Sequence, residues 1–82
     1  MELQSGIYGT TGDGTTTTFS FPHGCTTGTP NAVVSDNTLH FNKTGGPVAM
    51  RSYCDATNIN VEFLSAPASG VTMNWNWIAI VN

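Results

Sequence analysis

The residues best suited to chemistry in this 82-residue sequence are His23 and Cys25, which flank Gly24 after a Phe-rich segment. A cysteine and a histidine brought together in space can act as a nucleophile and its general base. Closeness in a loop does not by itself bring two side chains together. We interpret His23 instead as a side chain that hydrogen-bonds the backbone of a turn where a strand ends. No serine lies in a Gly-x-Ser-x-Gly elbow, so we expect no enzyme.

Metal-binding and acid–base sites are also poorly supported by residue spacing. No pair of the soft ligands has the spacing of a zinc knuckle; these ligands are His23, Cys25, His40 and Cys54. Most of the acidic residues lie at predicted turns or near the N-terminus, where aspartate caps backbone amides; they are Glu2, Asp13, Asp36, Asp55 and Glu62. We therefore expect no metal and no cofactor. A disulfide between Cys25 and Cys54 is possible, although free thiols are commoner in a chain without an export signal.

Two tryptophans near the C-terminus could bind a sugar. Trp75 and Trp77 share one face of a predicted strand, so they could stack on sugar rings while Asn74 and Asn76 bind hydroxyl groups. Alternate aromatic residues on a strand more often face the interior. Because Met73 lies on the same face, we favour a core position for both tryptophans.

The elements that must position these residues are strands. Apolar residues alternate over short segments bounded by Gly, Pro, Asn and Asp, which predicts strands at 15–21, 31–35, 38–42, 48–54, 57–63 and 71–81. No segment has helical periodicity. The pattern predicts an all-β fold, a small antiparallel β-sandwich or a jelly-roll-like barrel. Its predicted core comprises Phe19, Phe21, Val33, Ile59, Val61, Phe63, Met73, Trp75 and Trp77.

The first residues differ in character from the rest. Residues 1–14 hold four glycines but also Leu3, Ile7 and Tyr8, which makes the segment too apolar for an idle tail and too glycine-rich for a strong strand. We expect either an N-terminal arm that docks on a neighbour through these three side chains or a frayed terminus. The β-sandwich domain is then expected over residues 15–82.

Composition excludes several partners. Only 2 residues are basic and 5 acidic, with a net charge of −3, so the chain lacks the basic surface that binds nucleic acid or anionic membranes. No apolar run is long enough for a transmembrane helix, and the N-terminus lacks the pattern of a signal peptide. A chain this short usually needs a further source of stability. Oligomerisation is the leading one here.

Several short motifs resemble a known module. They are Phe19-Ser-Phe-Pro-His-Gly24, Thr29-Pro30 before Ala32-Val-Val34, Cys54-Asp-Ala-Thr-Asn-Ile-Asn-Val-Glu-Phe63, Ala66-Pro67 with Gly70, and Asn74-Trp-Asn-Trp77. Over about residues 19–79 the sequence resembles a small β-sandwich module of tailed-bacteriophage virion proteins. Cys25 and Thr26 stand where that family usually has Leu-Gly.

The resemblance implies a non-enzymatic virion component. The implied function is that of a capsid decoration, or cement, protein, which binds the major capsid protein on the capsid exterior and stabilises the shell. Such a protein would be a homotrimer assembled in the host cytoplasm. The alternative is a receptor- or glycan-binding module of a tail fibre or spike, which would use Trp75, Trp77, Asn74 and Asn76.

Overall fold

The structure is a computed structural model that describes residues 1–36 and 50–82. Its regular elements are β1 (Glu2–Thr11), β2 (Thr18–Pro22), β3 (Asn31–Asp36), β4 (Met50–Cys54), β5 (Asn58–Phe63) and β6 (Thr72–Val81). The described residues form no helix, and so none that is long and apolar enough to cross a membrane. The predicted all-β class is confirmed.

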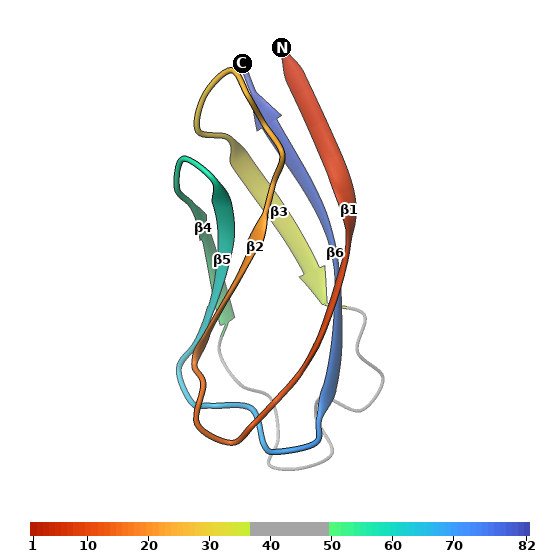
Figure 1. Cartoon of the computed structure of the whole chain (residues 1–82), viewed down its shortest axis with the longest axis vertical. Helices are drawn as coiled ribbons and strands as arrows, with labels where there is room; N and C mark the ends of the chain where they lie inside the picture. The colour runs from red at the N-terminus through yellow and green to blue at the C-terminus, as the bar shows by residue number, and fades with distance from the viewer. Residues whose placement is uncertain (37–49) are drawn as a thin grey trace.

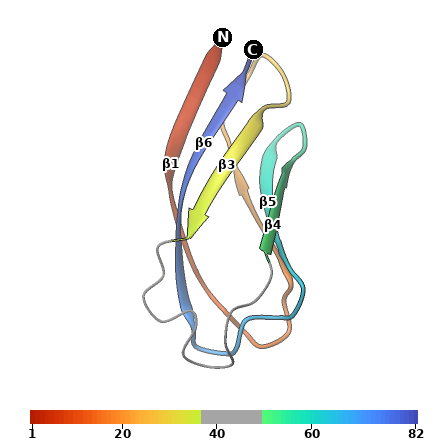
Figure 2. The same ribbon diagram turned by 180° about the vertical axis from the view of Figure 1, so that it is seen from behind.

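The strands form two three-stranded antiparallel sheets packed as a small sandwich. One sheet has the order β1-β6-β3 and the other the order β2-β5-β4, so β6 and β5 are the central strands. Figures 1 and 2 show the two layers from opposite sides. Both ends of the chain lie at the same end of the sandwich, because β1 and β6 pair antiparallel over their whole length (Figure 1).

Five of the predicted strands overlap observed ones. Those predicted at 15–21, 31–35, 48–54, 57–63 and 71–81 correspond to β2, β3, β4, β5 and β6. The strand predicted at 38–42 lies outside the described residues. The alternation of apolar and polar residues thus located most of the strands to within a few positions.

The separate N-terminal arm was a wrong prediction. Residues 2–11 form β1, which pairs with β6 without interruption from Glu2 opposite Val81 to Thr11 opposite Thr72. Glycines made this segment look like a poor strand, but one of them, Gly6, is required by packing. Gly6 lies opposite Trp77, and a Cβ atom at Gly6 would come within 3.1 Å of the indole ring, so only glycine leaves the ring its full space. The sandwich therefore begins at β1 rather than at residue 15.

The core is built from the inward faces of the two central strands. Ile59 and Val61 of β5 and Met73, Trp75 and Ala79 of β6 have no exposed surface. Each alternates with outward residues, as the two-residue period of a strand requires. Burial of these side chains supplies the main favourable free energy for folding.

Aromatic rings surround Trp75. The centroid of its ring system lies 5.8 Å from Phe19, 6.0 Å from Phe63, 6.3 Å from Phe21 and 6.0 Å from Tyr8. Tyr8 also stacks on Phe21 at 4.5 Å. These separations lie in the range in which aromatic pairs attract beyond simple area burial. The cluster joins β1 and β6 of one sheet to β2 and β5 of the other.

The predicted core was correct except at one residue. Val33 is 72% exposed, whereas Phe21, Ile59, Val61, Phe63, Met73 and Trp75 are buried, and Phe19 and Trp77 are partly buried against them. The error at Val33 follows from two consecutive valines, which leave the facing of β3 undetermined in the sequence. Pairing with β6 decides it, because Val34 lies opposite the inward-facing Trp77.

Among the described glycines, Gly12 leaves the least room for a side chain, which gives a test of the fold. A Cβ atom there would lie 2.5 Å from the carbonyl oxygen of Ala68. One at Gly9 would meet the side chain of Asn74 at 3.0 Å and the carbonyl oxygen of Met73 only at 3.9 Å, an ordinary contact. We expect Gly12→Ala to lower the free energy of unfolding by about 1–3 kcal/mol, as overpacking does. Gly9→Ala is the matched control and should cost clearly less. Equal midpoints in urea unfolding of both variants would contradict this close approach.

Candidate binding surface

Among the described residues, most of the exposed large apolar side chains lie on the outer face of the β1-β6-β3 sheet. Leu3, Ile7, Val33 and Ile78 are 56%, 72%, 72% and 49% exposed. Strand register brings them together, because Ile78 lies opposite Val33 while Leu3 lies opposite Ile80, two residues from Ile78. We call the surface formed by Leu3, Ile7, Val33, Ile78 and Ile80 the apolar face.

The surroundings of the apolar face are polar but uncharged. The other outward positions of the three strands are Ser5, Gly9, Thr11, Asn31, Ser35, Thr72, Asn74 and Asn76. None of the outward residues of these described strands is ionisable. A hollow of about 130 Å³ lies between β3 and β6, lined by Val33, Ser35, Asn76, Trp77 and Ile78. A partner could cover such a surface without removing ions from water, which is the costly part of burying a charged surface.

The structure divides the three predicted contact residues of the N-terminus. Leu3 and Ile7 lie on the apolar face, but Tyr8 points inward and stacks on Phe21. A strand sends successive side chains to opposite faces, so Ile7 and Tyr8 cannot serve one contact surface. The sequence analysis missed Val33 and Ile78 as surface residues. Once Val34 and Trp77 are known to face inward, the alternation along each strand places Val33 and Ile78 on the outer face.

The four residues proposed for sugar binding do not form one site. Trp75 is fully buried and Trp77 packs partly buried against the core, as favoured from the sequence. Asn74 and Asn76 lie at alternate positions on the opposite, outer face. The amides and the indole rings therefore face opposite sides of the sheet, which rules out stacking and hydroxyl binding of one sugar by this set.

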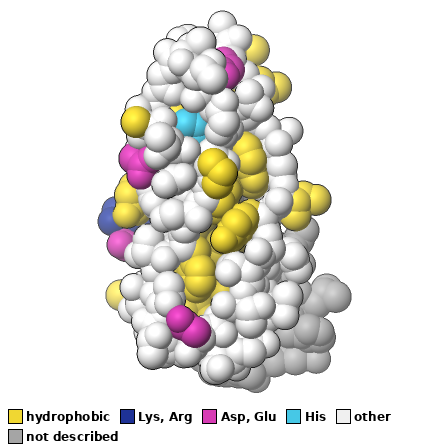
Figure 3. All heavy atoms as spheres, in the orientation of Figure 1, with side chains coloured by type: hydrophobic (Ala, Val, Ile, Leu, Met, Phe, Trp, Pro, Cys, Tyr) yellow, Lys and Arg dark blue, Asp and Glu magenta, His cyan; other side chains and the backbone are white. Residues whose placement is uncertain are grey.

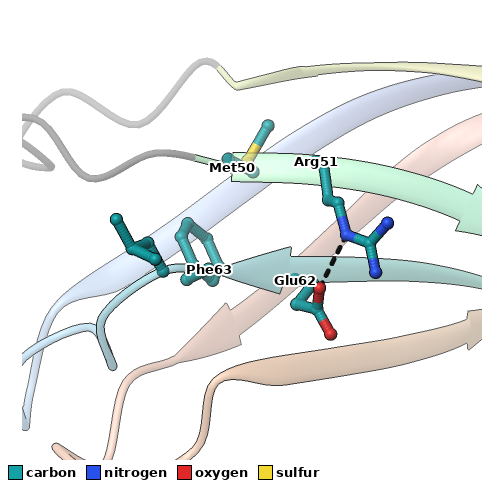
Figure 4. A pocket seen from close by; sticks show the side chains of 5 residues that line it. Met50, Arg51, Glu62 and Phe63 are labelled. Carbon is teal, nitrogen blue, oxygen red and sulfur yellow. Dashed lines mark hydrogen bonds and ion pairs between the residues drawn. The ribbon is translucent and has the colours of Figure 1, made fainter.

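The outer face of the other sheet carries polar and charged side chains that bond to one another, with Tyr53 exposed among them. Ser20 donates to Asn60 over 2.6 Å, and Asn60 donates to Asp55 over 3.1 Å. Arg51 forms a 2.6 Å ion pair with Glu62 beside a pocket of about 350 Å³ (Figure 4). Apolar residues, among them Met50 and Phe63, form the rest of its lining. Because the ion pair is exposed to water, it contributes little to stability.

His23 is a structural residue within the described chain. It is 1% exposed, and its two ring nitrogens both have backbone partners. The amide of Cys25 donates to Nδ1 over 3.0 Å, so Nδ1 must be the unprotonated nitrogen, and Nε2 donates to the carbonyl oxygen of Asp55 over 3.0 Å. The ring thereby ties the end of β2 to the turn between β4 and β5. The hydrogen-bonding role expected from the sequence is confirmed.

The two cysteines are not activated. Both are free thiols, partly buried against the core cluster. Burial, and next the Glu2 carboxylate, raises the pKa of Cys25, while burial, and next Asp55, raises the pKa of Cys54. A thiol with a raised pKa is a poor nucleophile at neutral pH. With Nδ1 of His23 engaged by the Cys25 amide, His23 and Cys25 do not form a catalytic pair.

The carboxylates of Glu2, Asp13 and Asp55 serve as anchors for loops. Asp13 accepts hydrogen bonds from the amides of Thr15 and Thr16, and Asp55 accepts them from the amides of Thr57 and Asn58. Glu2 accepts bonds from the amides of Thr26 and Thr27, which fastens that loop to the start of β1.

These bonds favour the ionised form of each carboxylate. The Thr27 hydroxyl and the amides of Thr26 and Thr27 lower the pKa of Glu2 to about 2. The amides of Thr57 and Asn58 lower the pKa of Asp55 to about 2, and bonds from Thr16 and Thr15 lower that of Asp13. No group of three or more metal-ligating side chains gathers anywhere in the described residues.

The hydrogen bonds of His23 predict the effects of two substitutions. His23→Ala removes both bonds and leaves a buried cavity, so we expect a loss of about 2–4 kcal/mol in the free energy of unfolding. His23→Asn keeps an acceptor close to the position of Nδ1 and should cost less. The measurement is urea unfolding of both variants. A His23→Ala protein as stable as the original would show that the ring does not hold the turn.

The carboxylate anchors predict a defined acid sensitivity. The pKa of Glu2 is lower in the folded chain than its ordinary value of 4.5, so its contribution is complete above that pH and disappears as the pH falls to about 2. We therefore expect the melting temperature to fall between pH 4.5 and 2. Glu2→Gln should melt lower at pH 7 and show a flatter profile in that range. Superimposable profiles for the two proteins would contradict the role of Glu2.

Comparisons with known proteins identify no relative of this chain. No family model, no curated protein and no solved structure matches it.

Proposed function

We propose that this protein is a bacteriophage capsid decoration protein that adheres to the outer capsid surface through its apolar face. The observation that carries the proposal is an exposed apolar patch without ionisable residues on one sheet, in a sequence that resembles virion β-sandwich modules. Contiguous exposed apolar surface on a small protein marks interaction sites. The partner is the major capsid protein, and the bound protein stabilises the shell from outside after assembly in the host cytoplasm.

The size of the apolar face favours binding in several copies. The whole outer face of this sheet, of which the apolar face is a part, covers at most roughly 34 Å by 14 Å, about 500 Å². A stable interface of standard size buries about 800 Å² on each partner. One copy alone would bind weakly, and linked copies would gain affinity through avidity. The resemblance implies a homotrimer at three-fold positions of the shell as one such assembly.

Binding through the apolar face makes a mutational prediction. We expect Val33→Glu to place a charge within the contact and to lower occupancy on empty capsids by about tenfold or more, since burying an unpaired charge is costly. Leu64→Glu is the matched control, because Leu64 is 83% exposed and lies outside this face. Co-sedimentation with empty capsids measures both. Equal occupancy of the two variants, each folded by circular dichroism, would remove the apolar face from the proposal.

A further inference from the structure

The free edge of β1 is the most regular strand edge in the described sandwich. β1 lies at the edge of its sheet and pairs only with β6 among the described strands. It runs for 10 residues with one-to-one pairing, without a bulge and without proline. Its only charged residue is Glu2 at one end, whose carboxylate is bound by Thr26 and Thr27. A long edge that is nearly free of charge is a template for pairing with another strand.

The other three edge strands carry features that discourage pairing. β2 is 5 residues long and ends at Pro22, and β4 is 5 residues long and carries Arg51. β3 has 6 residues, follows Pro30 and ends at Asp36. Short length, proline and charge are the devices by which proteins protect sheet edges. The contrast singles out β1 as the unprotected edge.

Apolar surface lies on the same side of the sandwich. β1 and β2 belong to different sheets, and Figure 3, drawn in the orientation of Figure 1, shows apolar side chains gathered between them. Tyr8 of β1 and Phe19 of β2 are only partly buried against the core. A strand added at β1 would lie beside this surface.

We propose that two copies of this chain pair through antiparallel β1 strands into one six-stranded sheet. An antiparallel pair of identical strands has two-fold symmetry and needs no second kind of surface. Side chains on one face must pair with one another, so odd-numbered residues meet odd-numbered residues. The register that sets Ser5 against Ser5 of the second copy also sets Leu3 against Ile7 of that copy, twice. Apolar cross-strand pairs of this kind stabilise a sheet.

The pair would also enlarge the apolar face. The two-fold axis runs perpendicular to the sheet, so the outer faces of both copies lie on the same side. Their combined area of about 1,000 Å² then exceeds what a standard interface buries on one partner. The pairing stands without the proposed function, and its two-fold symmetry differs from the three-fold assembly that the resemblance implies.

The test is the mass of the free protein in solution. Light scattering after size exclusion, with loadings from about 10 µM to about 1 mM, covers the range expected for a small interface. We expect the mass to rise from monomer to dimer. Ser5→Lys should weaken dimerisation by about tenfold or more, because two like charges would face each other across the axis. Ser35→Lys is the matched control on the outer face of β3 and should dimerise as the original does.

Three results would overturn the proposed pairing or its register. A protein that is monomeric at every loading, or trimeric, overturns the pairing. An equal loss of dimer in Ser5→Lys and Ser35→Lys would assign the contact to the apolar face and overturn the edge. Circular dichroism of both variants shows that each is folded. In a separate assay with oxidised glutathione, Ser5→Cys should form a disulfide-linked dimer faster than Ser35→Cys, and equal rates would overturn the Ser5–Ser5 register.

Discussion

The burial of Trp75 is the interaction on which the rest of the sandwich depends. Its indole N–H has no hydrogen-bond partner within the described chain, which costs about 1–3 kcal/mol. Burying about 200 Å² of aromatic surface at about 25 cal/mol per Å² returns about 5 kcal/mol, so burial wins. Because rings from three other strands meet at this side chain, the two sheets are held at the distance that these rings set.

The two outer faces of the sandwich have opposite chemistry. On the β2-β5-β4 sheet, polar side chains satisfy one another through Ser20, Asn60 and Asp55, and Arg51 is paired with Glu62. On the β1-β6-β3 sheet, the exposed side chains are apolar or uncharged and include none that could be ionised. The few charged side chains among the described residues thus lie away from the outer face of the β1-β6-β3 sheet. That asymmetry gives the molecule a side suited to contact and a side suited to water.

Much of the fold could be predicted from the sequence, but less of the surface. Alternation located β5 and the inward face of β6, and the isolation of His23 at a strand end indicated its backbone bonds. β1 was missed because its glycines lower strand propensity, and the fit of Gly6 beside Trp77 depends on a strand that comes late in the sequence. Val33 was misplaced because either valine of the pair could face inward. Both errors concern pairing partners, which local patterns do not specify.

The pairing of the first strand with the last has a consequence for how the chain folds. Glu2 pairs with Val81, so the edge of this sheet forms only when nearly the whole chain is present. Contacts between residues so far apart in the sequence must overcome a large loss of loop entropy before they gain stability. A sandwich of this kind folds in milliseconds to seconds rather than microseconds. During synthesis, β1 therefore stays unpaired until the ribosome has made β6.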